Sequence, residues 1–485
     1  MRLLVILHYL GALLALLGAF MLVPFLVSVL YQEPDQFALL ASAVLTSGTG
    51  LSLRFWTRRH PGPMLRRESF LVVALGWVLA SAFGALPYLL AGTFTSYIDA
   101  YFETMSGFTT TGSSVLADIE AQPHGILFWR DFTQWLGGMG IITLFIALVP
   151  LTRIGAAGAS ALFEDEVPAP QVDRITPRIR ETARAMWLIY VVITAVEIAL
   201  LLLAGMPLFD AVTNSFGTMA TGGFSPRNAS IAHYRSPGVD WIIIAFMAIA
   251  GANFGLYYLI WKGKIRRALR DTELQVYLAI LAGCSVLVAV DLMANSGYTS
   301  LGEALRFGAF QIVSQQTTTG FATADFDLWP WLSKSLVLLV MFIGASSGST
   351  GGALKVVRLV IVAKYAHRQI YSSFKPRVVL PLKIGGRVIP DNIIRESVAF
   401  FIVYQSVFLF STLAVIALGL DFITGLSGVA ATLGNVGPGL GEVGPALNYA
   451  SIPDLAKIIF TFDMYVGRLE LWTVLILLRP AFWKE

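Results

Sequence analysis

The residues Ser314-Gln-Gln-Thr-Thr-Thr-Gly-Phe321 lie between two apolar segments, each long enough to cross a membrane. At the centre of this stretch is Thr317-Thr318-Thr319-Gly320. β-Branched threonines favour an extended backbone, and a glycine can adopt a positive φ that turns successive carbonyl groups toward one axis. Such a strand can replace the hydration shell of a cation if several copies face one another. A single copy of this motif is more often an ordinary strand-to-turn junction. The interpretation as a cation site therefore depends on whether the sequence contains further copies.

Three related stretches occur elsewhere, with neighbouring copies about 100 to 120 residues apart. They are Thr109-Thr110-Thr111-Gly112, Met219-Ala220-Thr221-Gly222 and Gly434-Asn435-Val436-Gly437. A repeating period of this kind indicates an internal structural repeat. Because four copies are enough to close a ring, the pattern predicts a filter for ions lined by backbone carbonyls.

The composition fits a polytopic membrane protein, because 56% of the 485 residues are hydrophobic and only 13% are charged. The single cysteine, Cys284, lies in an apolar segment, which excludes disulfides, thiolate metal sites and redox pairs. The five histidines show no ligand spacing. The apolar run that begins at Leu3 is longer than the core of a signal peptide, so we expect it to be retained as a first span.

Ten apolar spans are expected, and a short amphipathic stretch followed by a glycine motif interrupts them four times. The spans fall at residues 3–30, 36–56, 69–92, 126–150, 183–205, 240–261, 273–295, 331–363, 392–419 and 455–479. The repeating unit is therefore span, short helix, filter strand, span. This divides the chain into two extra N-terminal helices at 1–62, repeat 1 at 63–165, repeat 2 at 166–265, repeat 3 at 266–385 and repeat 4 at 386–485.

The basic residues support this topology. Most of the 34 Lys and Arg residues lie near the two termini or in segments that the ten-span arrangement places on one side. The exceptions are Arg130, Arg227, Arg235, Arg306, Lys334, Lys457 and Arg468. By the positive-inside rule both termini are cytoplasmic, and all four filter strands enter from outside.

An acidic residue stands near the start of each short helix: Asp99, Asp210, Glu303 and Asp421. A carboxylate there can cap the helix and suits the positive end of its dipole. The negative ends would then stabilise a dehydrated cation near the membrane centre. Alternatively, these side chains are only helix caps at the outer surface.

Glycine clusters also recur in the middle of the second span of each repeat. For Gly137–Gly140 and Gly251–Gly255 we favour close packing of continuous helices. The third cluster differs, since it contains nine consecutive small residues with poor helix propensity. Non-helical backbone at membrane depth is tolerated only where it lines a cavity or is buried in protein, so this cluster is a candidate gate below the filter. Its members are Gly344, Ala345, Ser346, Ser347, Gly348, Ser349, Thr350, Gly351 and Gly352. The alternative is a continuous helix with a tightly packed face of small residues.

Arg468 lies near the midpoint of the last span, too far from either end to reach the surface. An intramembrane charge is costly and usually faces a cavity and a partner. We expect Arg468 to face the pore as a barrier to cations, with residues 344–352, Glu470 or Asp463 as its partners. The alternative is a purely structural ion pair with one of the two acids.

Together these motifs resemble the bacterial Trk/Ktr superfamily of potassium transporters, over essentially the whole chain. The similarity rests on the four repeats, Ala-Thr-Gly-Gly-Phe-Ser at 220–225, Asn-Val-Gly-Pro-Gly at 435–439, the break at 344–352 and Gly-Arg-Leu-Glu at 467–470. The two additional N-terminal helices resemble those of the TrkH branch. The resemblance implies an all-α polytopic membrane protein in which four tandem helix, pore helix, filter and helix repeats form a pseudo-tetrameric potassium-channel-like pore.

The resemblance also implies the ligands of the ion. The filter carbonyls would come from Thr110, Thr111, Gly112, Ala220, Thr221, Gly222, Thr318, Thr319, Gly320, Asn435, Val436 and Gly437. Relatives that pass sodium tend to carry serine in place of a filter glycine, whereas all four glycines are present here. The second and fourth strands depart from Thr-Thr-Gly, which predicts an asymmetric ring with fewer or weaker sites.

Members of the superfamily are similar in acting as homodimers in the bacterial inner membrane, in contact with lipid and not with nucleic acid. A cytoplasmic, nucleotide-binding subunit of the RCK type, TrkA-like in this branch, opens the gate. We therefore expect potassium as substrate, no covalently bound cofactor, and nucleotide only on the partner. The basic segment 355–395 is a candidate docking surface, although membrane anchoring alone explains its charge.

Two other functions are less consistent with these motifs. A sodium- or proton-coupled carrier with a midplane site typically has two repeats, whereas this chain has four. A membrane enzyme would need a convergent nucleophile, acid–base or metal cluster, and the sequence offers none.

Overall fold

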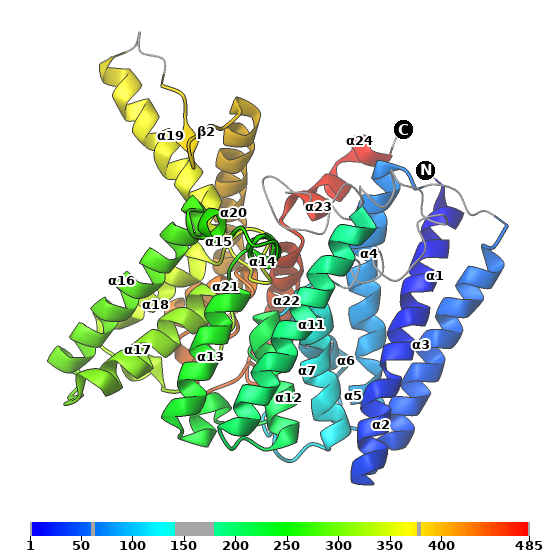
Figure 1. The fold of residues 1–485 in the computed structure, drawn as a ribbon. Coiled ribbons are helices and arrows are strands. Elements are labelled where there is room, and N and C mark those ends of the chain that lie inside the picture. The colour runs from blue at the N-terminus through cyan, green and yellow to red at the C-terminus, as the bar shows by residue number, and fades with distance from the viewer. Residues whose placement is uncertain (1, 60–63, 141–178, 376–379, 484–485) are drawn as a thin grey trace.

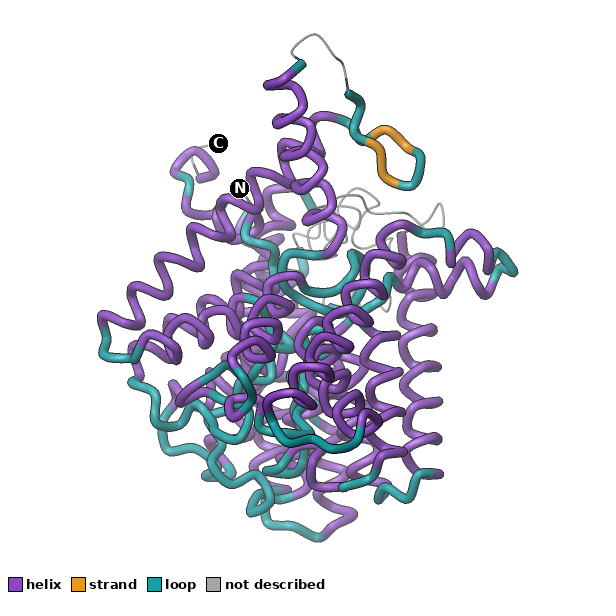
Figure 2. Tube along the Cα trace, turned by 90° about the vertical axis from the view of Figure 1, so that its left-hand side faces the viewer, coloured by secondary structure: helices purple, strands orange, loops and turns teal. Residues whose placement is uncertain are grey.

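The computed structural model describes residues 2–59, 64–140, 179–375 and 380–483. These residues form a bundle of helices, most of which run roughly parallel or antiparallel to one direction (Figure 1). The first and last described residues lie at the same end of the bundle, and an arm built from α19 (Val356–Phe374), a short hairpin and the start of α20 (Asp391–Ala417) projects at that end (Figures 1 and 2).

The N-terminal helices are α1 (Leu3–Phe20), α2 (Leu22–Tyr31) and α3 (Gln36–Trp56). Pro24 lacks the amide hydrogen that would continue α1, which explains the break at Met21. α1 and α3 approach closely, because a Cβ on Gly11 would lie 2.7 Å from the carbonyl oxygen of Gly50.

Each of the four repeats consists of an outer helix, a shorter re-entrant helix, an extended strand and a second helix that is broken or ends early. Repeat 1 contains α4 (Arg66–Gly84), α5 (Leu86–Leu90), α6 (Tyr97–Phe108) and α7 (His124–Gly138). Repeat 2 contains α11 (Ile179–Leu203), α12 (Leu208–Ala220), α13 (Pro237–Ala250), α14 (Phe254–Trp261) and α15 (Ile265–Leu269). Repeat 3 contains α16 (Thr272–Asn295), α17 (Leu301–Gln316), α18 (Trp331–Ile343) and α19. Repeat 4 contains α20, α21 (Phe422–Leu433), α22 (Asp454–Arg468), α23 (Trp472–Leu475) and α24 (Pro480–Trp483).

Short elements complete the fold. The single-turn helices of the 3₁₀ type are η1 (Ser230–Tyr234), η2 (Phe326–Leu328), η3 (Gly441–Val443) and η4 (Ile476–Leu478). Strands β1 (Lys383–Ile384) and β2 (Arg387–Val388) form an antiparallel hairpin in the projecting arm. Its two-residue turn is Gly385-Gly386, both at positive φ, which is the backbone that tight hairpins require.

Six helices of the described residues are long and apolar enough to span a membrane, and the bent pair α13–α14 makes a seventh. The prediction of ten continuous membrane-spanning helices is therefore wrong for several of them. The span 240–261 bends by 93°, the span 331–363 contains a long non-helical stretch, and the last span ends as a regular helix at Arg468. The second half of the expected span 126–150 lies outside the described residues.

The break in repeat 2 corrects the expectation of a continuous helix through Gly251–Gly255. α13 and α14 meet at an angle of 93°. The Asn253 side chain accepts a hydrogen bond from the Gly255 amide (2.8 Å) and so begins a new helix there. Gly251 still allows close packing, since a Cβ on it would lie 2.5 Å from the Tyr277 hydroxyl. The small residues therefore allow both the bend between α13 and α14 and the close packing against Tyr277.

Candidate functional site

All four re-entrant helices, α6, α12, α17 and α21, end in the same backbone motif. In repeat 1, the Thr111 amide donates to the Ser106 carbonyl (2.8 Å) and the Thr110 amide to the Gly107 carbonyl (3.0 Å), with Thr110 in the left-handed conformation. This is a Schellman ending. The corresponding left-handed residues in repeats 2, 3 and 4 are Thr221, Thr318 and Asn435.

Glycine is the usual residue at that position, and a β-branched residue there is an outlier. Three of the four copies nevertheless carry threonine. Strain of this kind persists only where the surroundings hold it, and it concentrates at functional sites. Here the threonine side chains have partners: Thr318 Oγ1 accepts from the Gly352 amide (2.8 Å), and Thr221 Oγ1 donates to Thr350 Oγ1 (3.2 Å).

Two residues after each left-handed residue comes a glycine at positive φ: Gly112, Gly223, Gly320 and Gly437. Each glycine faces a carbonyl oxygen of the next strand in the ring. A Cβ would overlap the oxygen of Gly222 if built on Gly112, of Thr319 if on Gly223, and of Val436 if on Gly320. A Cβ on Gly437 would lie 2.8 Å from the oxygen of Thr111. We number the stretches 110–112, 221–223, 318–320 and 435–437 as strands 1 to 4. The contacts run from strand 1 to 2, from 2 to 3, from 3 to 4 and from 4 back to 1, so the four strands surround one axis.

This ring reveals one register difference from the sequence interpretation. In repeat 2 the residue equivalent to Gly112 is Gly223, because Gly223 and not Gly222 has the positive φ and faces the next strand. The equivalent triplet is thus Thr221-Gly222-Gly223 instead of Ala220-Thr221-Gly222. The consecutive glycines were the available signal, but the sequence offers no way to choose between them.

Hydrogen bonds between strands hold the ring together. Asn435 Nδ2 donates to Thr111 Oγ1 (3.0 Å) and to the Met464 carbonyl (2.9 Å). Ser113 Oγ donates to the Gly437 carbonyl (2.9 Å), which also accepts from the Tyr449 hydroxyl (3.0 Å). Strands 1 and 4, which are more than 300 residues apart in sequence, are therefore directly bonded.

The four acidic residues at the starts of the re-entrant helices have different partners. Only Asp421 caps its helix with its side chain, accepting from the amides of Ile423 (2.9 Å) and Thr424 (3.1 Å). Asp99 pairs with Lys457, and Asp210 with Arg227; Glu303 lies in the first turn of α17. All four lie at or near the positive ends of the helix dipoles, but the expected shared capping role is wrong for three of them.

The glycine- and serine-rich stretch 344–352 is non-helical, and the break extends to Lys355. Within it Gly344, Gly348, Ala353 and Lys355 have positive φ. The stretch lies against filter strand 3, since the Gly352 amide bonds Thr318. It also contacts the break in repeat 2, where the Ser346 amide donates to the Gly251 carbonyl (2.9 Å) and the Phe254 amide to the Gly348 carbonyl (3.0 Å).

Arg468 is buried between this loop and filter strand 1. Its guanidinium donates to the carbonyls of Thr350 (2.7 Å), Gly137 (2.6 Å) and Gly138 (2.7 Å) and to Thr110 Oγ1 (3.1 Å). Of the partners expected for Arg468, the loop 344–352 contacts it, through the Thr350 carbonyl. Glu470 pairs with Arg358, and Asp463 accepts from Ser411 (2.7 Å).

Sequence reasoning missed two charged residues that hold the loop. Glu273, at the start of α16, accepts from the Ser347 amide (2.7 Å), the Ser347 hydroxyl (2.8 Å) and the Val357 amide (3.2 Å), so it ties the middle of the loop to the start of α19. Lys355 is buried and its ammonium bonds the Gly351 carbonyl. The charges are visible in the sequence, but their contacts depend on the break in the helix.

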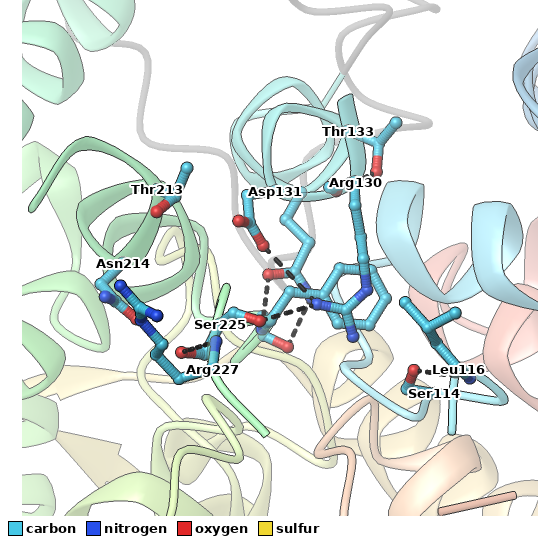
Figure 3. A network of polar contacts seen from close by, with 12 residues as sticks. Ser114, Leu116, Arg130, Asp131, Thr133, Thr213, Asn214, Ser225 and Arg227 are labelled. Carbon is cyan, nitrogen blue, oxygen red and sulfur yellow. Dashed lines mark hydrogen bonds and ion pairs between the residues drawn. The ribbon is translucent and has the colours of Figure 1, made fainter. Parts of the chain in front are cut away.

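A buried ionic network lies behind strands 1 and 2, where the chain leaves the ring (Figure 3). Glu103 of α6 accepts from Arg130 Nε (2.6 Å), the Ser114 hydroxyl (2.8 Å) and the Val115 amide (2.9 Å). Arg130 also donates to the Ser225 carbonyl (3.1 Å) and stacks on Phe224. This ion pair therefore joins the exits of two adjacent strands.

The described residues contain no group of three or more histidine, cysteine or acidic side chains placed to hold a metal ion. The ring instead brings backbone carbonyl oxygens from four segments close together. Carbonyls around one axis can replace the hydration shell of a monovalent cation. The fold and the site thus define a polytopic helical membrane protein in which four repeats surround a single carbonyl ring.

Comparison with known proteins agrees with that class. Residues 36–485 match the model of the TrkH family, described as a cation transport protein, and the chain belongs to this family. The "Trk system potassium uptake protein TrkH" of Halomonas elongata is 39% identical, with 100% of each chain covered. The protein of that name from Escherichia coli strain K12 is 38% identical over 98% of each chain.

A solved structure is also similar over the whole chain. The crystal structure of the potassium transporter TrkH from Vibrio parahaemolyticus covers 100% of both chains with a TM-score of 0.91 and 36% identity. The family predicted from the sequence motifs and the all-α polytopic fold are thereby confirmed. The expectation of transport and not catalysis is confirmed as well.

Proposed function

We propose that this chain takes up potassium across the bacterial inner membrane through a filter made by the four strands. The named activity of the relatives supports the ion. The observation that carries the mechanism is the closed ring in which each positive-φ glycine faces a carbonyl oxygen of the next strand. Carbonyls held at fixed separation suit one ion radius better than another.

The carbonyls proposed as ligands are those of the sequence interpretation, with Gly223 in place of Ala220. The oxygens of Thr111, Gly222, Thr319 and Val436 occupy equivalent positions and form one layer of the filter. The carbonyls of Thr110, Thr221, Thr318 and Asn435 form a second layer. The division into two N-terminal helices and four repeats, at the boundaries given above, is part of the same proposal.

Closure below the filter is assigned to the loop 344–352 and Arg468. The Arg468 guanidinium bonds Thr110 of strand 1 and Thr350 of the loop, so a positive charge stands next to the proposed cation route. A charge in that position opposes cation entry until it is displaced or screened. Glu273 and Glu470, through its pair with Arg358, hold the two sides of the loop.

We assign opening to a cytoplasmic, nucleotide-binding RCK-type subunit, TrkA-like, docked on the exposed part of the basic segment 355–395. Part of that segment forms the projecting arm (Figure 1). The arm follows directly after the loop, so a force on α19 reaches Val357 and its bond to Glu273. Both termini would be cytoplasmic, by the positive-inside rule, and the functional unit is a homodimer.

The test is uptake of rubidium-86 into proteoliposomes that contain the purified protein and internal potassium. Uptake that is blocked by external potassium much more than by sodium or lithium, with no sodium or proton gradient present, supports a passive potassium-selective pore. A strict requirement for such a gradient would replace it with the coupled carrier. If the protein alone shows no uptake, addition of a TrkA-like subunit with nucleotide must restore it.

A further inference from the structure

Gln134 is a buried glutamine of α7 whose carboxamide lies directly behind filter strand 2. Its Nε2 donates to the Gly222 carbonyl (2.6 Å), and its Oε1 accepts from the Phe224 amide (2.9 Å). The orientation of the carboxamide follows from these partners, since a carbonyl can only accept and a backbone amide can only donate. The two bonds fix the backbone on either side of Gly223.

The bonded carbonyl belongs to the ring. The Gly222 oxygen is the one that a Cβ on Gly112 would overlap, and its equivalents are the oxygens of Thr111, Thr319 and Val436. Among the described residues, no hydrogen bond reaches those three oxygens. One carbonyl of this layer is thus shared with a protein donor, while the other three are free to face an ion.

The fit behind strand 2 also explains why it has two consecutive glycines. A Cβ on Gly222 would lie 2.5 Å from Gln134 Cδ and 2.7 Å from its Oε1, so the carboxamide occupies the space of a side chain. Two glycines in a row make a backbone with many accessible conformations. The carboxamide of Gln134 supplies the constraint that the β-branched residues Thr319 and Val436 supply in strands 3 and 4.

We infer that Gln134 is a specificity-determining residue, which sets the potassium-over-sodium preference by fixing the Gly222 carbonyl in the ring. The inference rests on the proposed filter. The amide donor draws electron density from this oxygen and holds it at one distance from the axis, because the bond is buried and has no competing water. Without the donor, strand 2 can move inward around the smaller sodium ion. Gln134 acts through the carbonyl and is a positioning residue.

The test compares Gln134→Met and Gln134→Leu with Gln311→Met in the full-length protein. Methionine keeps the length of the side chain and removes both bonds; leucine removes both bonds with a shorter apolar side chain. Gln311 is a matched control because it is equally buried and bonds the Ala324 carbonyl (3.2 Å) outside the ring. The readout is the ratio of the sodium and potassium concentrations that halve rubidium-86 uptake.

Loss of the bond is expected to lower this ratio about fivefold to tenfold in both Gln134 variants, with uptake itself retained. Gln311→Met is expected to stay within about twofold of the wild type. Wild-type ratios in both Gln134 variants would overturn the inference, and so would an equal loss in the control. If Gln134→Met does not purify as a monodisperse protein, the ratio for Gln134→Leu decides alone. A wild-type protein that does not discriminate the ions would refute the proposed filter itself.

Discussion

Replacing Gly320 by serine tests the ring most directly, because this glycine meets two independent constraints. Its φ is +83°, a conformation that costs an L-residue about 1–2 kcal/mol. In addition, a Cβ would lie well inside 3.0 Å of the Val436 carbonyl oxygen and 2.9 Å from Pro438 Cδ. Forcing a side chain into a packed site typically costs about 1–3 kcal/mol. The sum, roughly 2–5 kcal/mol, is a large part of ordinary protein stability.

The structure can reduce this cost by moving the Val436 carbonyl away from Gly320. Relief of the overlap requires a shift on the order of 1 Å, and displacements of that size are enough to disable a geometrically tuned site. We therefore expect folded Gly320→Ser protein to lose potassium-over-sodium preference by tenfold or more, measured by competition against rubidium-86 uptake. Potassium flux is expected to fall less than selectivity.

Gly297→Ser separates the backbone strain of a positive φ from the steric overlap with a neighbouring carbonyl. Gly297 has a φ of +72° and no atom within 4 Å of the position of a Cβ, so it carries the strain without the clash. This variant is expected to lose about 1 kcal/mol of stability and no selectivity. Unchanged ion preference in folded Gly320→Ser, or an equal loss of preference in Gly297→Ser, would refute the carbonyl ring as the selective element.

Three further predictions concern the gate and the buried charges. Arg468→Gln removes the positive charge beside the filter, and partner-independent rubidium-86 uptake is expected to rise about tenfold, since hydrogen bonds to charged groups contribute about 1.5–3 kcal/mol. Glu273→Gln weakens the bonds to Ser347 in the loop and to Val357 in α19 and is expected to raise uptake severalfold, whereas the neighbouring Asp271→Asn, which alters only a helix cap, leaves it unchanged. Arg130→Met leaves the Glu103 carboxylate buried without its cation and is expected to lower the free energy of unfolding by about 3–5 kcal/mol, measured by thermal or denaturant unfolding in detergent.

Each of these predictions has a contradicting result. Equal or lower uptake by folded Arg468→Gln would remove that residue from the barrier. A rise in Asp271→Asn as large as in Glu273→Gln would show that the start of α16, and not its bonds to the loop, controls the flux. For the ion pair, the exposed contact between Arg368 and Asp391 is the control; its loss is expected to cost no more than about 1 kcal/mol.

The positions of the helix breaks depend on contacts between distant segments. The small residues at 251–255 are compatible with a packed continuous helix as well as with a bend, since glycine allows both close contact and unusual backbone angles. The bend is stabilised by partners from elsewhere, because the Gly251 carbonyl and the Phe254 amide bond the loop of repeat 3. A local pattern does not contain those partners. For the same reason the sequence did not distinguish Gly222 from Gly223.

The class of the protein, the family and the positions of the four strands could be predicted from the residues alone. These properties depend on local and additive signals: apolar length, the placement of basic residues, and β-branched residues followed by glycine at a repeating interval. Which carbonyl faces which glycine, and which side chains hold them, became visible only in the folded chain. Gln134, Glu273 and Arg468 act on backbone atoms of distant segments, and such contacts exist only after the repeats have closed around one axis.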